Sequence, residues 1–285
     1  MRRIRIEHIT EYRFPVPVTL GAHRLLVRPR EGHDIRIESS LLDIKPAYRI
    51  EWHREIYGNS LAVVTFLEPA AYLRIASDVI VQHYEDQPLD FSLHPSAEWY
   101  PFNYDPLEQI DLVPYQTPVF PRDTKALKAW ITRFCPPGER VETNELLRRL
   151  NAAIVERVSY AMREEPGVQS PMETLTLGKG SCRDLATLFI EACRFCGLAA
   201  RFVSGYLLSE AAVEDYGSTH AWSEIYLPGA GWRGYDSTSG QLTGPDHIAV
   251  AVNRRPDAVP PVSGSFLGPA EPRPTLEVQV RGRLV

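Results

Sequence analysis

The period at which apolar residues recur changes along this chain of 285 residues, and that change limits the fold more than any other feature. Over residues 1–85, apolar and polar residues alternate in short runs separated by turn residues. This pattern predicts antiparallel β-strands. From Asp123 onward, apolar residues recur every three or four positions, which predicts helices, and strand-like runs return after Gly197. Helices followed by strands indicate an α+β domain on the C-terminal side of the β-rich domain.

The segment between these regions, residues 86–121, is rich in proline and aromatic residues and has no clear period. We expect a linker there that packs along a surface and does not swing freely. The sequence therefore predicts three parts. They are a β-rich domain over 1–85, the linker over 86–121, and an α+β domain with a C-terminal strand over 122–285.

Charge and hydropathy exclude some classes of partner. Lys and Arg number 31 against 36 Asp and Glu, a net charge of −5, without a basic cluster that would bind nucleic acid. No apolar run approaches the roughly 20 residues that cross a bilayer, so we expect no membrane partner. The N-terminus alternates charged and apolar residues instead of showing a secretory signal. We therefore expect a cytoplasmic protein whose four cysteines are thiols.

The sharpest local motif is Gly178-Lys179-Gly180-Ser181-Cys182-Arg183-Asp184. Ser181 and Asp184 have the spacing of a capping box, and an apolar stripe follows as far as Gly197. The motif therefore predicts that Cys182 is the first residue of a buried helix. Unpaired N–H groups and the helix dipole favour an anion there, which is the nucleophilic form of a thiol. The alternative is a small core residue that happens to begin a helix.

A thiol nucleophile needs a base and a group that orients the base. His220 opens one alternating strand and Asp236 ends the next, although a surface histidine and a turn-forming aspartate are the simpler alternatives. Side chains alternate between the two faces of a strand. His220 and Asp236 therefore share a face only if the numbers of the residues paired across these two antiparallel strands add up to an even number. We therefore predict an odd loop or a bulge near Gly231, for example with Leu227 opposite Gly231, which sets Trp222 opposite Asp236 and His220 diagonal to it.

Several segments resemble the bacterial transglutaminase-like proteins. In the second part of the chain they are Gly180–Asp184, Ala199–Tyr206, His220–Trp222 and Gly231–Thr238. In the opening they are Tyr12–Phe14 and Arg24–Pro29, which are similar to the β-rich N-terminal domain of that family. The resemblance implies a papain-like α+β core in which Cys182 is the nucleophile, His220 the base and Asp236 the orienting residue. Arg183 and Ser237 stand where many relatives have Gln and Pro.

The reaction that this resemblance implies is thiol-dependent acyl transfer or hydrolysis on a glutamine carboxamide or a peptide amide, with a protein or peptide as substrate. The backbone N–H of Cys182 is the expected oxyanion donor. The hydroxyl of Tyr160 is a second candidate donor, and a buried tyrosine with a structural hydrogen bond is its alternative. A plain cysteine peptidase and a catalytically inactive peptide-binding module are the other readings. The acyl acceptor and the oligomeric state stay open.

Other residues of chemical interest have simpler explanations. Cys193 and Cys196 lie on the apolar stripe of the predicted helix and lack the second ligand pair of a zinc site, so we expect core packing. Cys135 is expected to be inert, and Asp184 to be a capping residue. The remaining histidines are expected at the surface or in the linker. They are His8, His23, His33, His53, His83, His94 and His247. We expect no cofactor and no metal requirement.

Overall fold

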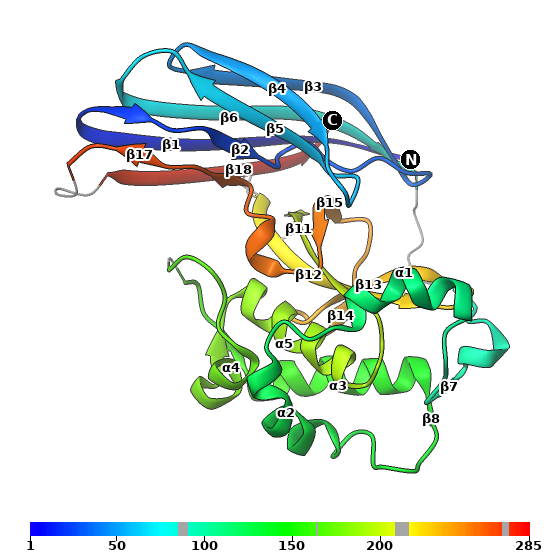
Figure 1. Ribbon diagram of the computed structural model, residues 1–285. Coiled ribbons are helices and arrows are strands. Elements are labelled where there is room, and N and C mark those ends of the chain that lie inside the picture. Colours follow the sequence, from blue (N-terminus) through cyan, green and yellow to red (C-terminus); the bar gives the residue numbers. More distant parts are fainter. Residues whose placement is uncertain (85–90, 164, 209–216, 270–273) are drawn as a thin grey trace.

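The computed structural model describes residues 1–84, 91–163, 165–208, 217–269 and 274–285. The predicted boundary between residues 85 and 86 therefore lies outside the described residues. Figure 1 shows a layer of long strands above a second part in which helices cover a smaller sheet, and both chain ends are marked at the strand layer. No helix among the described residues combines the length and hydropathy needed to cross a bilayer.

The strand layer consists of two antiparallel sheets. The first contains β17 (Phe266–Leu267), β1 (Arg2–Leu20), β6 (Ala70–His83) and β3 (Ile35–Lys45), and β18 (Thr275–Leu284) also pairs with β1. The second contains β16 (Val262–Ser263), β2 (His23–Leu25), β5 (Ser60–Phe66) and β4 (Tyr48–Arg54). Alternate residues of β1 and β6 are buried, as the period of two predicts. Side chains from both sheets, among them Phe14, Leu25, Val64 and Leu73, share one apolar cluster.

The C-terminal strand was predicted from its alternation, but its partner was not. Strand β18 runs antiparallel to β1, with Val280 opposite His8. The chain therefore returns to the N-terminal sheet after passing through the α+β part.

The second part is built on a five-stranded sheet. Its strands, in spatial order, are β14 (Gln241–Leu242), β13 (Gly231–Asp236), β12 (Gly217–Leu227), β11 (Ala200–Leu208) and β15 (His247–Asn253). Its helices are α2 (Thr124–Ile131), α3 (Thr143–Arg157), α4 (Pro171–Leu177) and α5 (Cys182–Phe195). Short elements complete it: η1 (Pro95–Ala97), β7 (Trp99–Tyr100), η2 (Pro121–Asp123), β8 (Val141–Glu142), β9 (Ser159–Tyr160), β10 (Lys179–Gly180) and η3 (Pro256–Ala258). This is the predicted α+β order.

Helix α5 is the central element of this part. Leu188 and Phe189 are fully buried, and so are Glu191 and Arg194, which form an ion pair of 2.8 Å. The Arg194 guanidinium also donates to the carbonyl oxygens of Tyr115, Ala200 and Arg254. Because a buried charge is costly unless it is paired and hydrogen-bonded, these contacts satisfy the Arg194 guanidinium and tie α5 to α1, to β11 and to the residue after β15.

The predicted linker contains a helix that its sequence does not reveal, α1 (Pro106–Gln116). Asp105 caps it, but Leu107, Ile110 and Val113 are exposed, so no buried apolar stripe marks it. Among residues 91–121, Tyr104 ties the chain to the α+β part. The Tyr104 hydroxyl accepts from the N–H of Ala199 and donates to the carbonyl oxygen of Tyr226.

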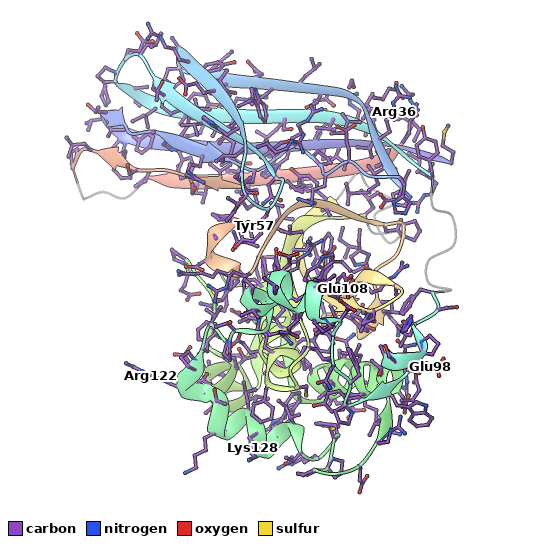
Figure 2. All side chains as sticks on the ribbon, turned by 45° about the vertical axis from the view of Figure 1, so that its right-hand side comes forward. Arg36, Tyr57, Glu98, Glu108, Arg122 and Lys128 are labelled. Atoms are coloured by element: carbon purple, nitrogen blue, oxygen red, sulfur yellow. The ribbon has the colours of Figure 1, made fainter. Side chains whose placement is uncertain are left out.

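The β layer and the α+β part share one hydrophobic core. Ile4 and Val79 of the β layer belong to the same buried cluster as Tyr206 and Ile248 of the smaller sheet. Figure 2 places Tyr57, on the β4–β5 turn, between the two parts, and its ring contacts that of Tyr115 with centroids 6.3 Å apart. The N-terminal layer is thus packed directly on the sheet that carries the candidate site.

Candidate active site

Cys182 is the first residue of helix α5, as the motif predicts. A capping box closes the helix start, in which the Asp184 carboxylate accepts from the Ser181 backbone N–H at 2.8 Å. The same buried carboxylate binds the Gln169 N–H at 2.7 Å and the Arg163 guanidinium at 2.9 Å. Asp184 is therefore a structural residue, and it fixes the backbone from which the half-buried Cys182 thiol projects.

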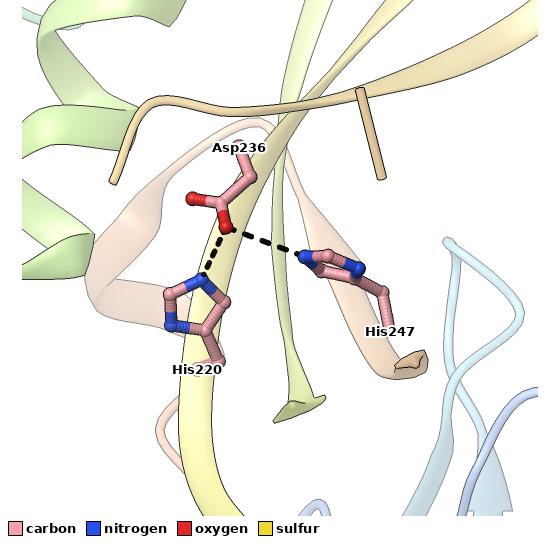
Figure 3. A group of neighbouring side chains, drawn as sticks. All are labelled: His220, Asp236 and His247. Carbon is pink, nitrogen blue, oxygen red and sulfur yellow. Dashed lines mark hydrogen bonds and ion pairs between the residues drawn. The ribbon is translucent and has the colours of Figure 1, made fainter. Parts of the chain in front are cut away.

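Strands β12 and β13 bring His220 and Asp236 together. Leu227 pairs with Gly231 across a three-residue turn, and this confirms the predicted register. Gly231 has a φ of 73°, a left-handed conformation that suits glycine. Continuing the ladder from the pair Ser223–Tyr235 sets Trp222 opposite Asp236. His220 Nε2 lies 3.0 Å from Asp236 Oδ2 (Figure 3).

Asp236 is held on all sides. Its Oδ1 accepts the N–H of Thr238 at 2.8 Å, and its side chain is nearly fully buried. Its backbone carbonyl accepts from Asn151 on α3, which in turn accepts from the Ser237 hydroxyl. Burial raises the pKa of Asp236, but hydrogen bonds from His220 and His247 outweigh burial and hold that pKa well below its usual range. The carboxylate is therefore charged at neutral pH.

The His220 ring has two acidic partners. Burial lowers its pKa, but hydrogen bonds to Asp236 and to the Cys182 thiol raise it to about 9. Because Nε2 faces Asp236, Nδ1 is the nitrogen left for the sulfur. The structure thus places the His220 ring against the Asp236 carboxylate, and the raised pKa of His220 favours its imidazolium form.

His247 is a part of this site that the sequence prediction missed. We expected it at the surface or in the linker, but its side chain is only 11% exposed and its Nε2 lies 3.3 Å from the same Asp236 Oδ2 (Figure 3). His247 opens an alternating strand after a Gly244-Pro245-Asp246 turn, but that position does not by itself tell a buried histidine from an exposed one. His220 stands at a similar place on its own strand.

Two histidines and a carboxylate are also a set that can bind a metal. Among the described residues, ligand atoms of His220, Asp236 and His247 lie within 4.8 Å of one another. However, His247 Nδ1 accepts the N–H of Gly244 at 3.2 Å, so its proton is on Nε2. A metal-binding Nε2 needs a lone pair, with Nδ1 as the donor. The donor set therefore fits a hydrogen-bonded carboxylate and does not fit a metal.

Tyr160 lies beside the nucleophile position. It pairs with Gly180 through the parallel strands β9 and β10, and it is half-exposed, unlike the buried tyrosine of the alternative reading. Burial and the Cys182 charge raise its pKa, so its hydroxyl keeps its proton. The N–H groups of Asp184 and Leu185 donate to the Ser181 carbonyl at the start of α5. The N–H of Cys182 precedes them in the first turn, where helix geometry provides no intrahelical acceptor. Both groups can therefore donate near the sulfur.

A pocket of about 460 Å³ opens next to this helix start. Its lining is mixed in charge, and its residues are Ala161, Met162, Arg163, Glu165, Gln169, Lys179 and Gly180.

Two other cysteines, Cys193 and Cys196, lie near the C-terminal end of the same helix. Burial raises the pKa of Cys193 well above its usual range and that of Cys196 to about 12, so both are core thiols, as expected.

The chain is similar to two groups of known proteins. Residues 4–82 match the bacterial transglutaminase-like N-terminal region, and residues 131–237 match the transglutaminase-like superfamily core. An uncharacterised protein of Mycobacterium tuberculosis is 30% identical over 281 residues, covering 92% of this chain and 87% of that protein. An uncharacterised protein of Mycobacterium leprae is 25% identical over 280 residues, with 94% of each covered.

One solved structure shares the whole fold. A candidate cysteine protease from Cytophaga hutchinsonii superposes with a TM-score of 0.74 at 19% identity, covering 100% of this chain and 91% of that one. The match extends over both the β layer and the α+β part. The chain belongs to the transglutaminase-like superfamily, with a bacterial transglutaminase-like N-terminal region ahead of the core.

Proposed function

We propose that the protein is a thiol-dependent enzyme that transfers or hydrolyses the acyl group of a glutamine carboxamide or a peptide amide. The observation that carries the proposal is the position of the His220 imidazole, whose Nε2 lies 3.0 Å from Asp236 Oδ2 and whose pKa is raised by hydrogen bonds to Asp236 and to the Cys182 thiol. A charged carboxylate and a raised His220 pKa favour a thiolate–imidazolium pair.

In the proposed first step, the Cys182 thiolate attacks the carbonyl carbon and the carbonyl oxygen becomes an oxyanion. The Cys182 backbone N–H and the Tyr160 hydroxyl donate hydrogen bonds to that oxygen. His220 then gives its proton to the departing amine or ammonia as the C–N bond breaks, which leaves a thioester on Cys182. Asp236 keeps the ring in the orientation that this transfer needs.

In the second step, an amine or water attacks the thioester and gives a proton to His220. The products are a new amide or a carboxylic acid, together with the free thiol. The likeness to a candidate cysteine protease favours peptide hydrolysis as the second candidate function. The pocket lined by Lys179 and Gly180, just before the Cys182 helix start, offers space for peptide.

The test uses a glutamine-containing peptide with and without a primary amine, followed by mass spectrometry. Amine incorporation identifies transfer, loss of ammonia without incorporation identifies deamidation, and backbone cleavage identifies a peptidase. Each requires Cys182, so the Cys182→Ala variant must be inactive, whereas Cys135→Ala must keep activity. A protein that binds peptide but forms no product under any condition contradicts the proposal and favours the binding module.

A further inference from the structure

We propose that His247 is a positioning residue of the catalytic site, which holds the Asp236 carboxylate in the orientation that His220 needs. This inference rests on the proposed function, since it assigns a role beside the same three residues. It adds a second histidine from a different strand, β15, to the group that the family resemblance identified.

The first support is the direction of the hydrogen bond. Because Gly244 donates to His247 Nδ1, the ring is a neutral donor through Nε2. Asp236 Oδ2 then receives two imidazole N–H groups, at 3.0 and 3.3 Å, while Oδ1 receives the Thr238 N–H at 2.8 Å. With both oxygens engaged, the carboxylate cannot rotate away from His220 without breaking a charge-assisted bond.

The second support is the packing of Trp222, which is buried and precedes Ser223, the partner of Tyr235 in the ladder. Its ring meets that of His247 edge-on, with centroids 5.3 Å apart, and lies 6.3 Å from that of His220. Gly205 makes room for this indole, because a Cβ there would come within 2.6 Å of it. The His220 and His247 rings thus both pack against the buried indole of Trp222, which restricts the position of each ring.

The third support is the way in which β15 is held. This strand lies at the end of its sheet, beside β11. On its other side, the buried Asn59 amide donates to the Val252 carbonyl at 2.8 Å and accepts the Val252 N–H at 2.9 Å. The Arg30 N–H donates to the Ala249 carbonyl. Next to His247, Asp246 pairs with Arg2 at 2.7 Å.

These contacts give the N-terminal β layer a role in the site. Asn59, Arg30 and Arg2 all belong to that layer, and all hold the strand that begins with His247. The titratable groups around the carboxylate come from three elements. They are His220 on β12, His247 on β15, and Cys182 on α5, whose thiol hydrogen-bonds to His220.

The test measures the rate of Cys182 alkylation by iodoacetamide between pH 5 and 9 in the full chain. We expect His247→Leu, which removes the donor, to slow the reaction near pH 6 about tenfold. We expect His247→Gln, which keeps an N–H donor at a similar reach, to stay near the wild-type rate. Substitution of an exposed histidine, His53→Leu, is the matched control and leaves the rate unchanged.

Thermal unfolding of each variant separates positioning from folding, because loss of structure alone slows both His247 variants in proportion to their unfolding. A wild-type rate in folded His247→Leu, or equal slowing in folded His247→Gln, overturns the inference. In both cases the proposed function survives, provided that the wild type still reacts faster than His220→Ala. If the wild type and His220→Ala react equally slowly, the proposed function itself fails, and the role of His247 fails with it.

Discussion

Leu227 pairs with Gly231 across the β12–β13 turn, and this register places His220 and Asp236 on the same face of the sheet. The turn has three residues, so paired numbers have an even sum. A turn with an even number of residues and no bulge would put the carboxylate on the face opposite the imidazole. The geometry of the site thus depends on one short connection.

Gly231 adopts a positive φ to close that turn, so a side chain there should cause strain. We expect Gly231→Ala to lower the free energy of unfolding by about 1 kcal/mol. Gly231→Asn should cost less, because asparagine tolerates the left-handed region. Urea denaturation of both variants measures the difference. Equal stability of wild type and Gly231→Ala contradicts this account of the turn.

Two histidines should make the stability of the fold depend on pH in opposite ways. The pKa of His220 is raised to about 9, and burial lowers that of His8 to about 4, both from 6.5. His220 therefore stabilises the fold fully below pH 6.5, and this contribution is lost as the pH rises through about 9. His8 makes the fold less stable as the pH falls from 6.5 towards 4, because only the unfolded chain binds its proton there.

Titration of the histidine ring signals by NMR tests both values, with His220→Gln and His8→Gln to assign them. The Asp236→Asn variant should move the His220 transition to lower pH, since the Asp236 carboxylate is the first of the two groups that raise the pKa of His220. A His220 transition near 6.5 in the wild type contradicts the ion-pair description.

Asp184 should matter for stability and not for chemistry. Asp184→Asn removes the charge that pairs with Arg163 and places an amide against two backbone donors, so we expect a loss of about 3 kcal/mol. Glu145 is the surface counterpart, since it pairs with two arginines at the surface of the protein. Glu145→Gln should therefore leave stability nearly unchanged. Chemical denaturation measures both. A small effect at Asp184 would contradict its assignment as the anchor of the helix start.

Tyr160 should contribute through its hydroxyl. We expect Tyr160→Phe to lower the turnover of a glutamine peptide on the order of 100-fold, the range seen when one oxyanion donor is lost. Its thiol labelling should stay close to wild type, because alkylation forms no oxyanion. Unchanged turnover would leave the Cys182 N–H as the donor that matters and remove Tyr160 from the mechanism.

Local sequence signals predicted the elements that carry the site, and long-range packing supplied what they missed. The glycine-rich motif located the start of α5, and the requirement that His220 and Asp236 share a face predicted an odd loop or a bulge near Gly231, such as the observed pairing of Leu227 with Gly231. His247 was missed because a histidine at a strand end has no local mark that distinguishes a surface position from a buried one. The hydrogen bond between Asn59 and Val252 joins residues 193 positions apart, and the spacing of apolar residues along the sequence does not predict such a contact.

Helix α1 was missed for a different reason. Its apolar residues Leu107, Ile110 and Val113 face outward, so the usual relation between apolar spacing and burial does not hold there. The partner of β18 was also beyond the sequence, since alternation predicts a strand but not the sheet that it joins.

The most direct test of the central claim is the rate of iodoacetamide labelling of Cys182 at pH 6. Cys135 is the matched thiol, because it is half-buried too and has no histidine partner among the described residues. We expect Cys182 to react faster than Cys135 by on the order of 100-fold, and this advantage should disappear in His220→Ala. Equal, slow labelling of both cysteines, or a rate at Cys182 that does not change in His220→Ala, would contradict an activated thiol at this helix start.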